Sequence, residues 1–238
     1  MQRSQRISTK VIVGTGVVVL TVIAQSGGPR PTCRHCSATY IPVSELDAYA
    51  AKAVKYQPVD QQVRSVDIGK VQVGVGMVTR GKLLPDASRK GAVAEHEQVS
   101  EVYHVIDGEA TLLTGPDLVN PVKRPDDERT VRLQNGPGYN SDAIRQPMVT
   151  HLKPGDLIII PAGTGHQFTE IPDHITYMMV RIDPEKVVPT KSEAESQADL
   201  KVIPPAGKGP KQERSVESWI GAKLRWCRSF PVPASPRM

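Results

Sequence analysis

Large aromatic residues are scarce in this chain, which has two Phe and two Trp among 238 residues. Hydrophobic residues still make up 39% of the sequence, which is enough for a core that Val and Ile must mostly fill. The length allows one good-sized domain with extensions. No internal repeat of useful length is visible, and serine-hydrolase and phosphate-loop patterns are absent from the central region.

Cysteine is rare as well, at positions 33, 36 and 227. Cys33 and Cys36 have the spacing of half a zinc site or of a redox pair. No second pair of this kind follows, so a zinc site made of two such pairs is excluded. In an oxidising compartment the two residues could close a small disulfide. The sequence favours two incidental cysteines in a linker, because the surrounding stretch is rich in Gly and Pro.

The formal charge of +5 does not describe the middle of the chain. Residues 1–36 contain five Lys or Arg and no acid, and residues 208–238 contain seven against two acids. Residues 37–207 are left with 18 basic and 23 acidic side chains, a net charge of −5. Because nucleic-acid binding needs a basic patch on the folded body, we expect no nucleic-acid partner.

The first 26 residues are typical of a secretory signal peptide. Basic side chains precede an uncharged, mostly apolar run over residues 11–24, and Ala24-Gln25-Ser26 offers a small-x-small cleavage site. The run is shorter than the roughly 20 residues that a membrane-spanning helix needs. We therefore predict a secreted or periplasmic protein without stable membrane insertion after cleavage near Ser26. An uncleaved membrane anchor is the alternative.

Residues 27–58 are expected to form a linker and one short helix, because Ser44 to Asp47 has the pattern of a capping box before an alanine-rich run. From about Val63 the hydrophobic residues alternate, which is typical of strands. Turn signals such as Gly69-Lys70 and Pro172-Asp173 separate the candidates. We predict strands at 63–68, 71–79, 101–106, 109–114, 130–134, 148–152, 156–161, 166–170 and 175–182.

Short strands with no helical pattern between them indicate a sandwich or a barrel, here over residues 59–188. The stretch from Gly136 to Asn140 is expected to be loop. The alternation stops after Pro189, so residues 189–238 are expected to be a largely disordered basic tail. Residues 215–230 allow a short amphipathic helix within it. Removing residues 190–238 is therefore expected to leave the stability of the domain nearly unchanged.

The first segment that carries chemistry runs from Ala94 to Gly108. Because alternate residues of a strand share a face, Glu101 and Tyr103 point one way and His104 the other. An unpaired carboxylate inside a barrel is costly, so a buried Glu101 needs a metal, a hydrogen-bond network or a proton.

The second segment runs from Gly155 to Glu170, where His166, Phe168 and Glu170 are expected to share a face. Its spacing resembles the second cupin motif, G(X)5PXG(X)2H(X)3N. The matching residues are Gly155, Pro161, Gly163 and His166, and Glu170 replaces the terminal Asn. The resemblance to the cupin superfamily covers about residues 63–183. The leader and the EVYHVIDG, LQNGPG and IIIPAGTGHQF segments also resemble a group of exported bacterial cupins, which supports the predicted compartment.

The first cupin motif, G(X)5HXH(X)3–4E(X)6G, is only partly kept. Glu101 and Gly108 are correctly spaced, and His96 stands where the second histidine belongs. Ala94 occupies the place of the first histidine. In a contracted alignment His96 is instead the first ligand, and Gln98 takes the second place. Both alignments remain open.

The resemblance implies an all-β fold of the cupin type, a double-stranded β-helix or jelly-roll barrel, with one short N-terminal helix and a largely disordered C-terminal tail. Two imidazoles and a carboxylate suit Fe(II), and Mn, Ni, Co or Zn would also fit. The implied metal ligands are His96, Glu101 and His166, with Gln98 as a further oxygen donor. The implied substrate pocket is lined by Tyr103, Phe168 and Glu170.

Two functions remain open at this point. The first is an exported metal-dependent enzyme that acts on a small organic molecule as an oxygenase, isomerase or lyase. The second is a non-catalytic module that binds a small molecule or a sugar derivative, which the absence of a histidine at Ala94 favours. Both functions imply a small-molecule ligand, and a homodimer is the assembly considered. The fold alone does not decide between them.

Overall fold

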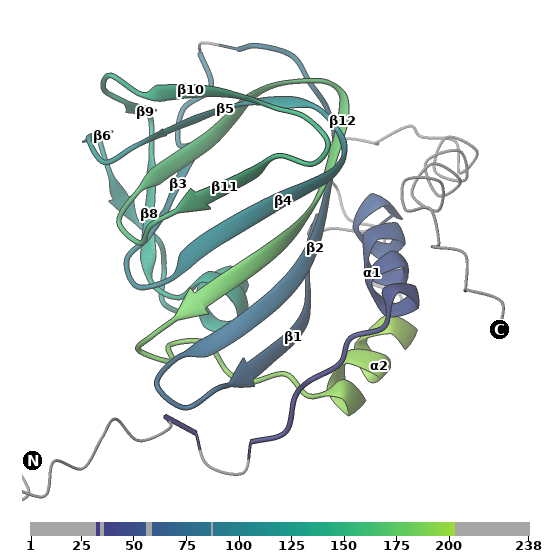
Figure 1. Cartoon of the computed structure of the whole chain (residues 1–238). Helices are drawn as coiled ribbons and strands as arrows, with labels where there is room; N and C mark the ends of the chain where they lie inside the picture. Colours follow the sequence, from purple (N-terminus) through teal and green to yellow (C-terminus); the bar gives the residue numbers. More distant parts are fainter. Residues whose placement is uncertain (1–31, 34–35, 56–58, 87, 203–238) are drawn as a thin grey trace, which may run out of the picture. The chain divides into compact units, whose positions relative to one another are not determined.

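The computed structural model describes residues 32–33, 36–55, 59–86 and 88–202 (Figure 1). These residues form a mostly antiparallel β structure with two α-helices and one π-helical turn. The elements are α1 (Val43–Lys55), β1 (Asp60–Asp67), β2 (Gln72–Leu83), β3 (Val93–His96), β4 (Ser100–Gly108), β5 (Ala110–Gly115), β6 (Leu118–Val119), β7 (Val122–Lys123), η1 (Val131–Asn135), β8 (Gly138–Ser141), β9 (Ala143–Ile144), β10 (Met148–Leu152), β11 (Leu157–Ile160), β12 (Gly165–Asp183) and α2 (Glu193–Lys201).

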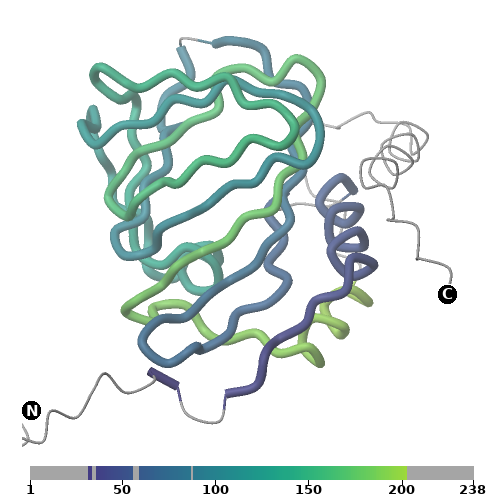
Figure 2. Tube along the Cα trace, viewed as in Figure 1, coloured from purple at the N-terminus to yellow at the C-terminus, as the bar shows by residue number. Residues whose placement is uncertain are grey.

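The long strand β12 joins the two halves of the β structure (Figure 2). Its first half pairs with β5 and β3, and its second half pairs with β2 and β4, always antiparallel. The sequence predicted two strands here, separated by a turn at Pro172-Asp173. That prediction is wrong, because the strand continues through this point with a register shift between Ile171 and His174 on the β2 side. Proline is tolerated there since a bulge needs no ladder hydrogen bond from it.

The strand order is β1-β2-β12-β3-β8-β7, with β11 added to β4 and β10 added to β5. In the described part of the chain β10 and β11 each pair on one side only, so no ladder joins them. The barrel is therefore open between these two strands, although its two layers still face each other across one core.

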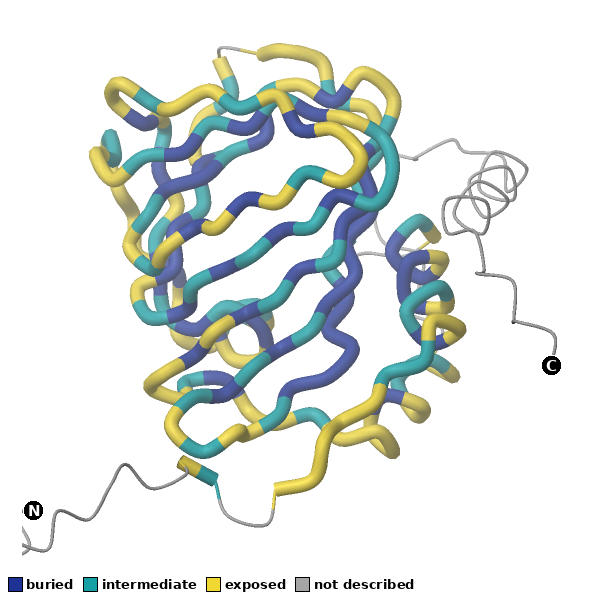
Figure 3. Tube along the Cα trace, in the orientation of Figure 1, coloured by how far each residue is buried: buried dark blue, intermediate teal, exposed yellow. Residues whose placement is uncertain are grey.

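The core between the layers is built from inward side chains at every second position. Along β4 and β5 buried residues alternate with less buried ones, as Figure 3 shows. Tyr103, Val105, Leu112, Ile175 and Tyr177 are at most 2% exposed. Each fully buried aliphatic or Phe side chain stabilises the fold by about 1.5–3 kcal/mol. Valine and isoleucine do supply much of this core, together with Tyr103, Tyr177 and Phe168.

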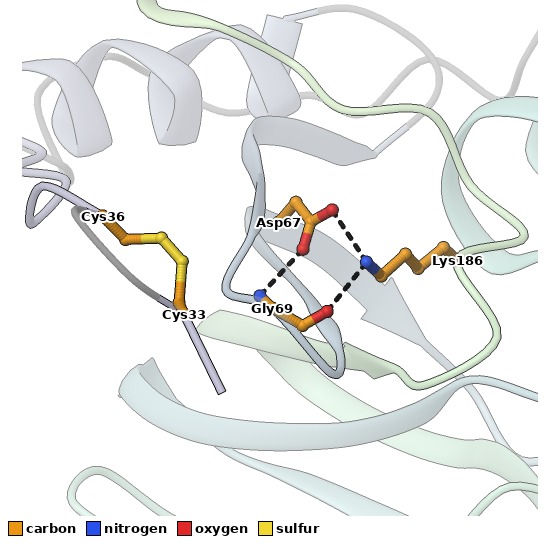
Figure 4. Close-up of a disulfide and its surroundings, with 5 residues drawn as sticks. All are labelled: Cys33, Cys36, Asp67, Gly69 and Lys186. Carbon is orange, nitrogen blue, oxygen red and sulfur yellow. Dashed lines mark hydrogen bonds and ion pairs between the residues drawn. A yellow bond between two sulfur atoms is a disulfide. The ribbon is translucent and has the colours of Figure 1, made fainter. Parts of the chain in front are cut away.

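The predicted hairpin at Gly69-Lys70 is confirmed and joins β1 to β2. Gly69 has φ +105°, a conformation that favours glycine. A Cβ atom at Gly69 would also lie 2.5 Å from the Thr32 carbonyl oxygen, so the segment containing Cys33 packs directly on this turn. Cys33 forms a disulfide with Cys36 beside the hairpin (Figure 4). The interpretation of two incidental cysteines is therefore wrong.

The tail prediction fails for the part of the tail that the structure describes. Residues 193–201 form α2, which begins with a capping box. The Ser192 hydroxyl accepts a hydrogen bond from the Glu195 backbone N–H, and the Glu195 carboxylate accepts one from the Ser192 N–H. Ser-x-x-Glu is the sequence signal for this helix start. The polar composition of the segment led instead to the prediction of disorder. Residues 203–238, with the helix considered over 215–230, lie outside the described residues, as does the predicted signal peptide.

The helix α2 packs on α1, the predicted N-terminal helix, through a buried polar network. Arg64 of β1 donates two hydrogen bonds to the Glu45 carboxylate, at 2.5 and 3.0 Å. The Ser196 hydroxyl donates to the same carboxylate at 2.6 Å. Lys52 donates to the Asp199 carbonyl at 2.6 Å, and Lys52, Glu45 and Arg64 are all buried. The predicted tail thus satisfies buried charges of the domain.

Two further predictions between β5 and β10 are wrong. Residues 130–134, predicted as a strand, instead fall at the N-cap and the first four positions of η1. Val131 and Gln134 are buried while Leu133 is 38% exposed, a helical spacing rather than alternation. The Gln134 amide donates to the Asp60 carbonyl, which fixes that burial. The predicted loop at 136–140 instead contains the start of β8, which pairs with β3.

Candidate metal centre

His96, Glu101 and His166 converge inside the barrel. They stand at the end of β3, near the start of β4 and near the start of β12, and all three are buried. His96 Nε2 lies 3.5 Å from Glu101 Oε1, and His166 Nε2 lies 3.5 Å from Glu101 Oε2. One donor atom of each residue lies within 4.8 Å of the others. Glu101 therefore stands between the two imidazoles.

Both imidazoles are held neutral. Burial lowers the pKa of His96 well below its ordinary value, and His166, Arg124 and Arg181 add to the effect. Burial also lowers the pKa of His166, although the Glu101 carboxylate works against the shift. Neutral imidazole is the form that binds a metal, so both rings keep a lone pair at neutral pH.

The two oxygens of Glu101 have different surroundings. The Tyr103 hydroxyl donates to Oε2 at 2.7 Å. Burial, with a contribution from Glu101, raises the pKa of Tyr103 well above its ordinary value, so this donor keeps its proton. Oε1 accepts no hydrogen bond within the described structure, and its charged neighbour is Arg181 Nε at 3.5 Å. Since a buried unsatisfied carboxylate oxygen is costly, Oε1 is the atom most open to a cation.

These residues fit a divalent metal in donor type and spacing. Two imidazoles and one carboxylate are a common ligand set for a divalent transition metal with open positions. Arg124, which is not one of the three candidate ligands, works against metal binding at His96. One of its Nη atoms lies 2.9 Å from His96 Nδ1. Arginine only donates hydrogen bonds, so Nδ1 accepts and the proton of the neutral ring stands on Nε2. A metal at Nε2 must displace that proton.

Ala94 and Gln98 occupy different places relative to this set. Ala94 lies on the same face of β3 as His96, and its Cα is paired with that of His166 on β12. A histidine at Ala94 would therefore stand beside the cluster, which supports the alignment that makes His96 the second histidine. The Gln98 side-chain oxygen is buried and accepts no hydrogen bond in the described structure. Its lone pairs are therefore not used by another described residue.

The three residues predicted to line a substrate pocket differ in burial. Tyr103 and Phe168 are buried, with their ring centroids 6.4 Å apart. Glu170 is exposed. The cause is a bulge between Phe168 and Glu170, where β12 slips by one residue against β5 and turns Glu170 to solvent. The buried residue that follows is Ile171.

Sequence reasoning missed the residues that surround the triad. Arg124, Arg181 and Tyr177 are buried beside it, and Tyr177 packs 4.5 Å from the Tyr103 ring. An arginine at an inward position of a predicted strand, as at Arg181, was the available signal. Nothing local marks Arg124, because it reaches His96 from the connection after β7.

The first strand–turn–strand unit thus brings His96 and Glu101 to the inner face of an open antiparallel barrel. The second unit brings His166 to the same face. An open antiparallel barrel of this kind agrees with the fold that the resemblance to the cupin superfamily implies. The predicted mostly β class and the short N-terminal helix are confirmed. Among the described residues, no helix is long and apolar enough to cross a bilayer.

No protein-family model matches the sequence, and no curated protein matches it. Solved structures do match. A protein from Bacillus halodurans is 13% identical over 69% of this chain and 97% of its own, with a TM-score of 0.35. The DMSP lyase DddQ from Ruegeria pomeroyi is 14% identical over 50% of this chain and 42% of its own, with a TM-score of 0.29. A cupin protein from Bacteroides fragilis is 13% identical over 48% and 68%, with a TM-score of 0.26. Structural similarities with sequence identities and TM-scores this low say nothing about the function of this chain.

Proposed function

We propose that this chain is a metal-dependent cupin enzyme that binds one divalent ion through His96, Glu101 and His166 and acts on a small organic molecule. The observation that carries the proposal is the placement of two neutral imidazoles 3.5 Å from the two oxygens of a buried carboxylate, one of which accepts no hydrogen bond. Fe(II), Mn, Ni, Co and Zn all suit such a donor set. Gln98 supplies a further oxygen.

A bound metal would supply Lewis acidity or activate oxygen at this site. The residues around it have their own roles. Tyr103 holds a proton on its hydroxyl at 2.7 Å from Glu101, and the buried rings of Phe168 and Tyr177 pack against Tyr103. This arrangement suits an oxygenase, an isomerase or a lyase.

A metal-free binding module is the second candidate, and a specific observation favours it. Glu101 already has Tyr103 as a donor and Arg181 as a countercharge. Arg124 also fixes the His96 tautomer that opposes a metal at Nε2. In that case the same barrel would bind a small molecule or a sugar derivative without chemistry.

We also propose that the protein is exported, since residues 1–26 have the pattern of a signal peptide. Intact-mass analysis of the extracytoplasmic fraction should then give a chain that begins near Ser26. A full-length mass in the membrane fraction would establish an anchor instead.

Metal binding is tested by the thermal midpoint of chelator-treated protein with each of the five metals. A metal that binds only the folded state stabilises it by about 2.7 kcal/mol at 100 times its Kd, which raises the midpoint by roughly 5–11 °C for a domain of this size. His166→Ala should abolish most of this rise. His104→Ala is the matched control, because His104 lies on the other face of β4 and should change neither metal content nor the rise. If no metal shifts the wild-type midpoint, the metal-free module is the correct reading.

A further inference from the structure

Two arginines outside the triad contact Phe168 and have no acidic partner. Arg80 lies on the inner face of β2, the face of the buried Val78, and its register partner on β12 is the buried Ile175. Its guanidinium carbon lies 5.4 Å from the centroid of the Phe168 ring. Its Nε donates to the Tyr177 hydroxyl at 3.4 Å. Among the residues that the structure describes, its terminal nitrogens make no hydrogen bond or ion pair.

Arg89 reaches the same residue from the segment between β2 and β3. One of its terminal nitrogens donates to the Phe168 carbonyl at 2.7 Å. Its Nε is buried and has no hydrogen-bond partner in the described structure. A buried donor without an acceptor is costly, so this nitrogen indicates a missing acceptor at Phe168.

Two of the other buried arginines are paired with carboxylates, whereas Arg124 bonds to His96 and to the Glu95 carbonyl. Arg64 pairs with Glu45, and Arg181 pairs with Asp60. Within the described ranges, by contrast, no carboxylate lies within 4.0 Å of Arg80 or Arg89. Burial works to lower the pKa of Arg80, but Tyr177, Tyr103 and Asp60 outweigh it, so the guanidinium keeps its charge.

Phe168 connects these two cations to the candidate metal centre through Tyr103. The Phe168 ring stacks on Tyr103, whose hydroxyl reaches Glu101, and the Tyr103 ring lies 6.3 Å from that of His166. Arg80 is also among the charges that lower the pKa of His166.

We propose that Arg80 and Arg89 form an anion site at Phe168 that takes a carboxylate group of a small organic acid. Two guanidinium groups with free donors match the two oxygens of a carboxylate, and the Phe168 ring packs against the carbon chain that carries it. The description of this acid as the substrate rests on the proposed metal enzyme, whereas the anion site itself does not.

The test measures binding of succinate to chelator-treated full-length protein by calorimetry, with succinamide as the uncharged probe of similar shape. Succinate should bind and succinamide should not. Arg80→Gln and Arg89→Gln should each weaken succinate binding at least about tenfold, because each removes a charge-assisted hydrogen bond. Lys82→Gln removes the same charge from an exposed position of β2 and should leave the affinity unchanged.

Arg80→Lys guards against a folding defect, since it keeps the charge and should retain weakened binding. The proposal is overturned if succinate does not bind, if succinamide binds equally well, or if Lys82→Gln weakens binding as much as Arg80→Gln. His166→Ala separates the two hypotheses. Loss of metal with retained succinate binding leaves the anion site standing whatever becomes of the enzyme, and retained metal binding with no succinate binding rejects the anion site alone.

Discussion

The contact between α2 and α1 predicts that truncation before α2 destabilises the domain. A chain ending at Lys191 loses the hydrogen bond from Ser196 to buried Glu45 and the acceptors of buried Lys52 on Asp199. Hydrogen bonds to charged groups contribute about 1.5–3 kcal/mol each, so the loss of one bond by Ser196 and one by Lys52 is about 3–6 kcal/mol. For a domain of this size the thermal midpoint should fall by roughly 6–24 °C.

The reference for this measurement is a chain ending at Val202, which keeps α2. Both chains are compared by calorimetric and fluorescence-detected melting in the same buffer. Ser196→Ala should reproduce part of the loss, about 1–2 kcal/mol, whereas Glu193→Ala on the same helix, with a side chain that is 76% exposed, should change little. Equal midpoints for the two truncated chains would refute the reasoning and restore the expectation that residues after 190 are dispensable.

Three further predictions concern the triad. Arg124→Gln should tighten metal binding several-fold in a titration, because an amide oxygen there can accept a hydrogen bond from a proton on His96 Nδ1, which leaves the Nε2 lone pair free for the metal; equal or weaker binding would contradict the tautomer argument. Ala94→His should also raise metal affinity, as measured by competition with a chelator, since position 94 is paired with His166; no gain would contradict that placement. In metal-free protein the lowered pKa values of His96 and His166 mean that the unfolded chain takes up protons near pH 6.5 while the folded chain does not. Stability should therefore be full above pH 6.5 and fall below it, by up to about 1.4 kcal/mol per pH unit for each histidine; urea unfolding of His166→Gln should show a shallower fall, and an equal slope would contradict it.

Strand positions could be predicted where alternation and turn chemistry agreed. The hairpin at Gly69 and the turn at Gly108 are examples. Gly108 has φ +77°, and a Cβ there would lie 2.1 Å from the His174 carbonyl oxygen. The residues on the inward face of β4 could be predicted because side chains of a strand alternate between its two faces. This alternation correctly placed Glu101 and Tyr103 on one face and His104 on the other.

The failures have physical causes that act beyond a local window. The bulge before Glu170 reverses the alternation within one strand, and its position depends on the pairing with β5. Residues 130–134 alternate in sequence but have no strand partner, and the Gln134 contact with Asp60 decides their conformation. The helix α2 is polar, and its Ser196 and Asp199 contact the buried charges of Glu45 and Lys52 on α1.

The spacing of the two motifs was enough to bring His96, Glu101 and His166 together in the prediction. It could not indicate the arginines around them. Arg124 acts through a hydrogen bond to the far nitrogen of His96, and Arg181 balances Glu101 from a neighbouring strand. Whether the site holds a metal depends on the contacts of Arg124 and Arg181 with the ligands as much as on the three ligands themselves.

The metal content of the isolated protein tests the central claim most directly. The full chain, produced without a metal-binding tag and purified without chelators, is measured by elemental analysis beside His166→Ala and His104→Ala. We predict one divalent metal per wild-type and His104→Ala chain and a large loss in His166→Ala. A wild-type protein without stoichiometric metal, whose melting temperature none of Fe(II), Mn, Ni, Co or Zn raises, would contradict the claim and leave Glu101 held by Tyr103 and Arg181 alone.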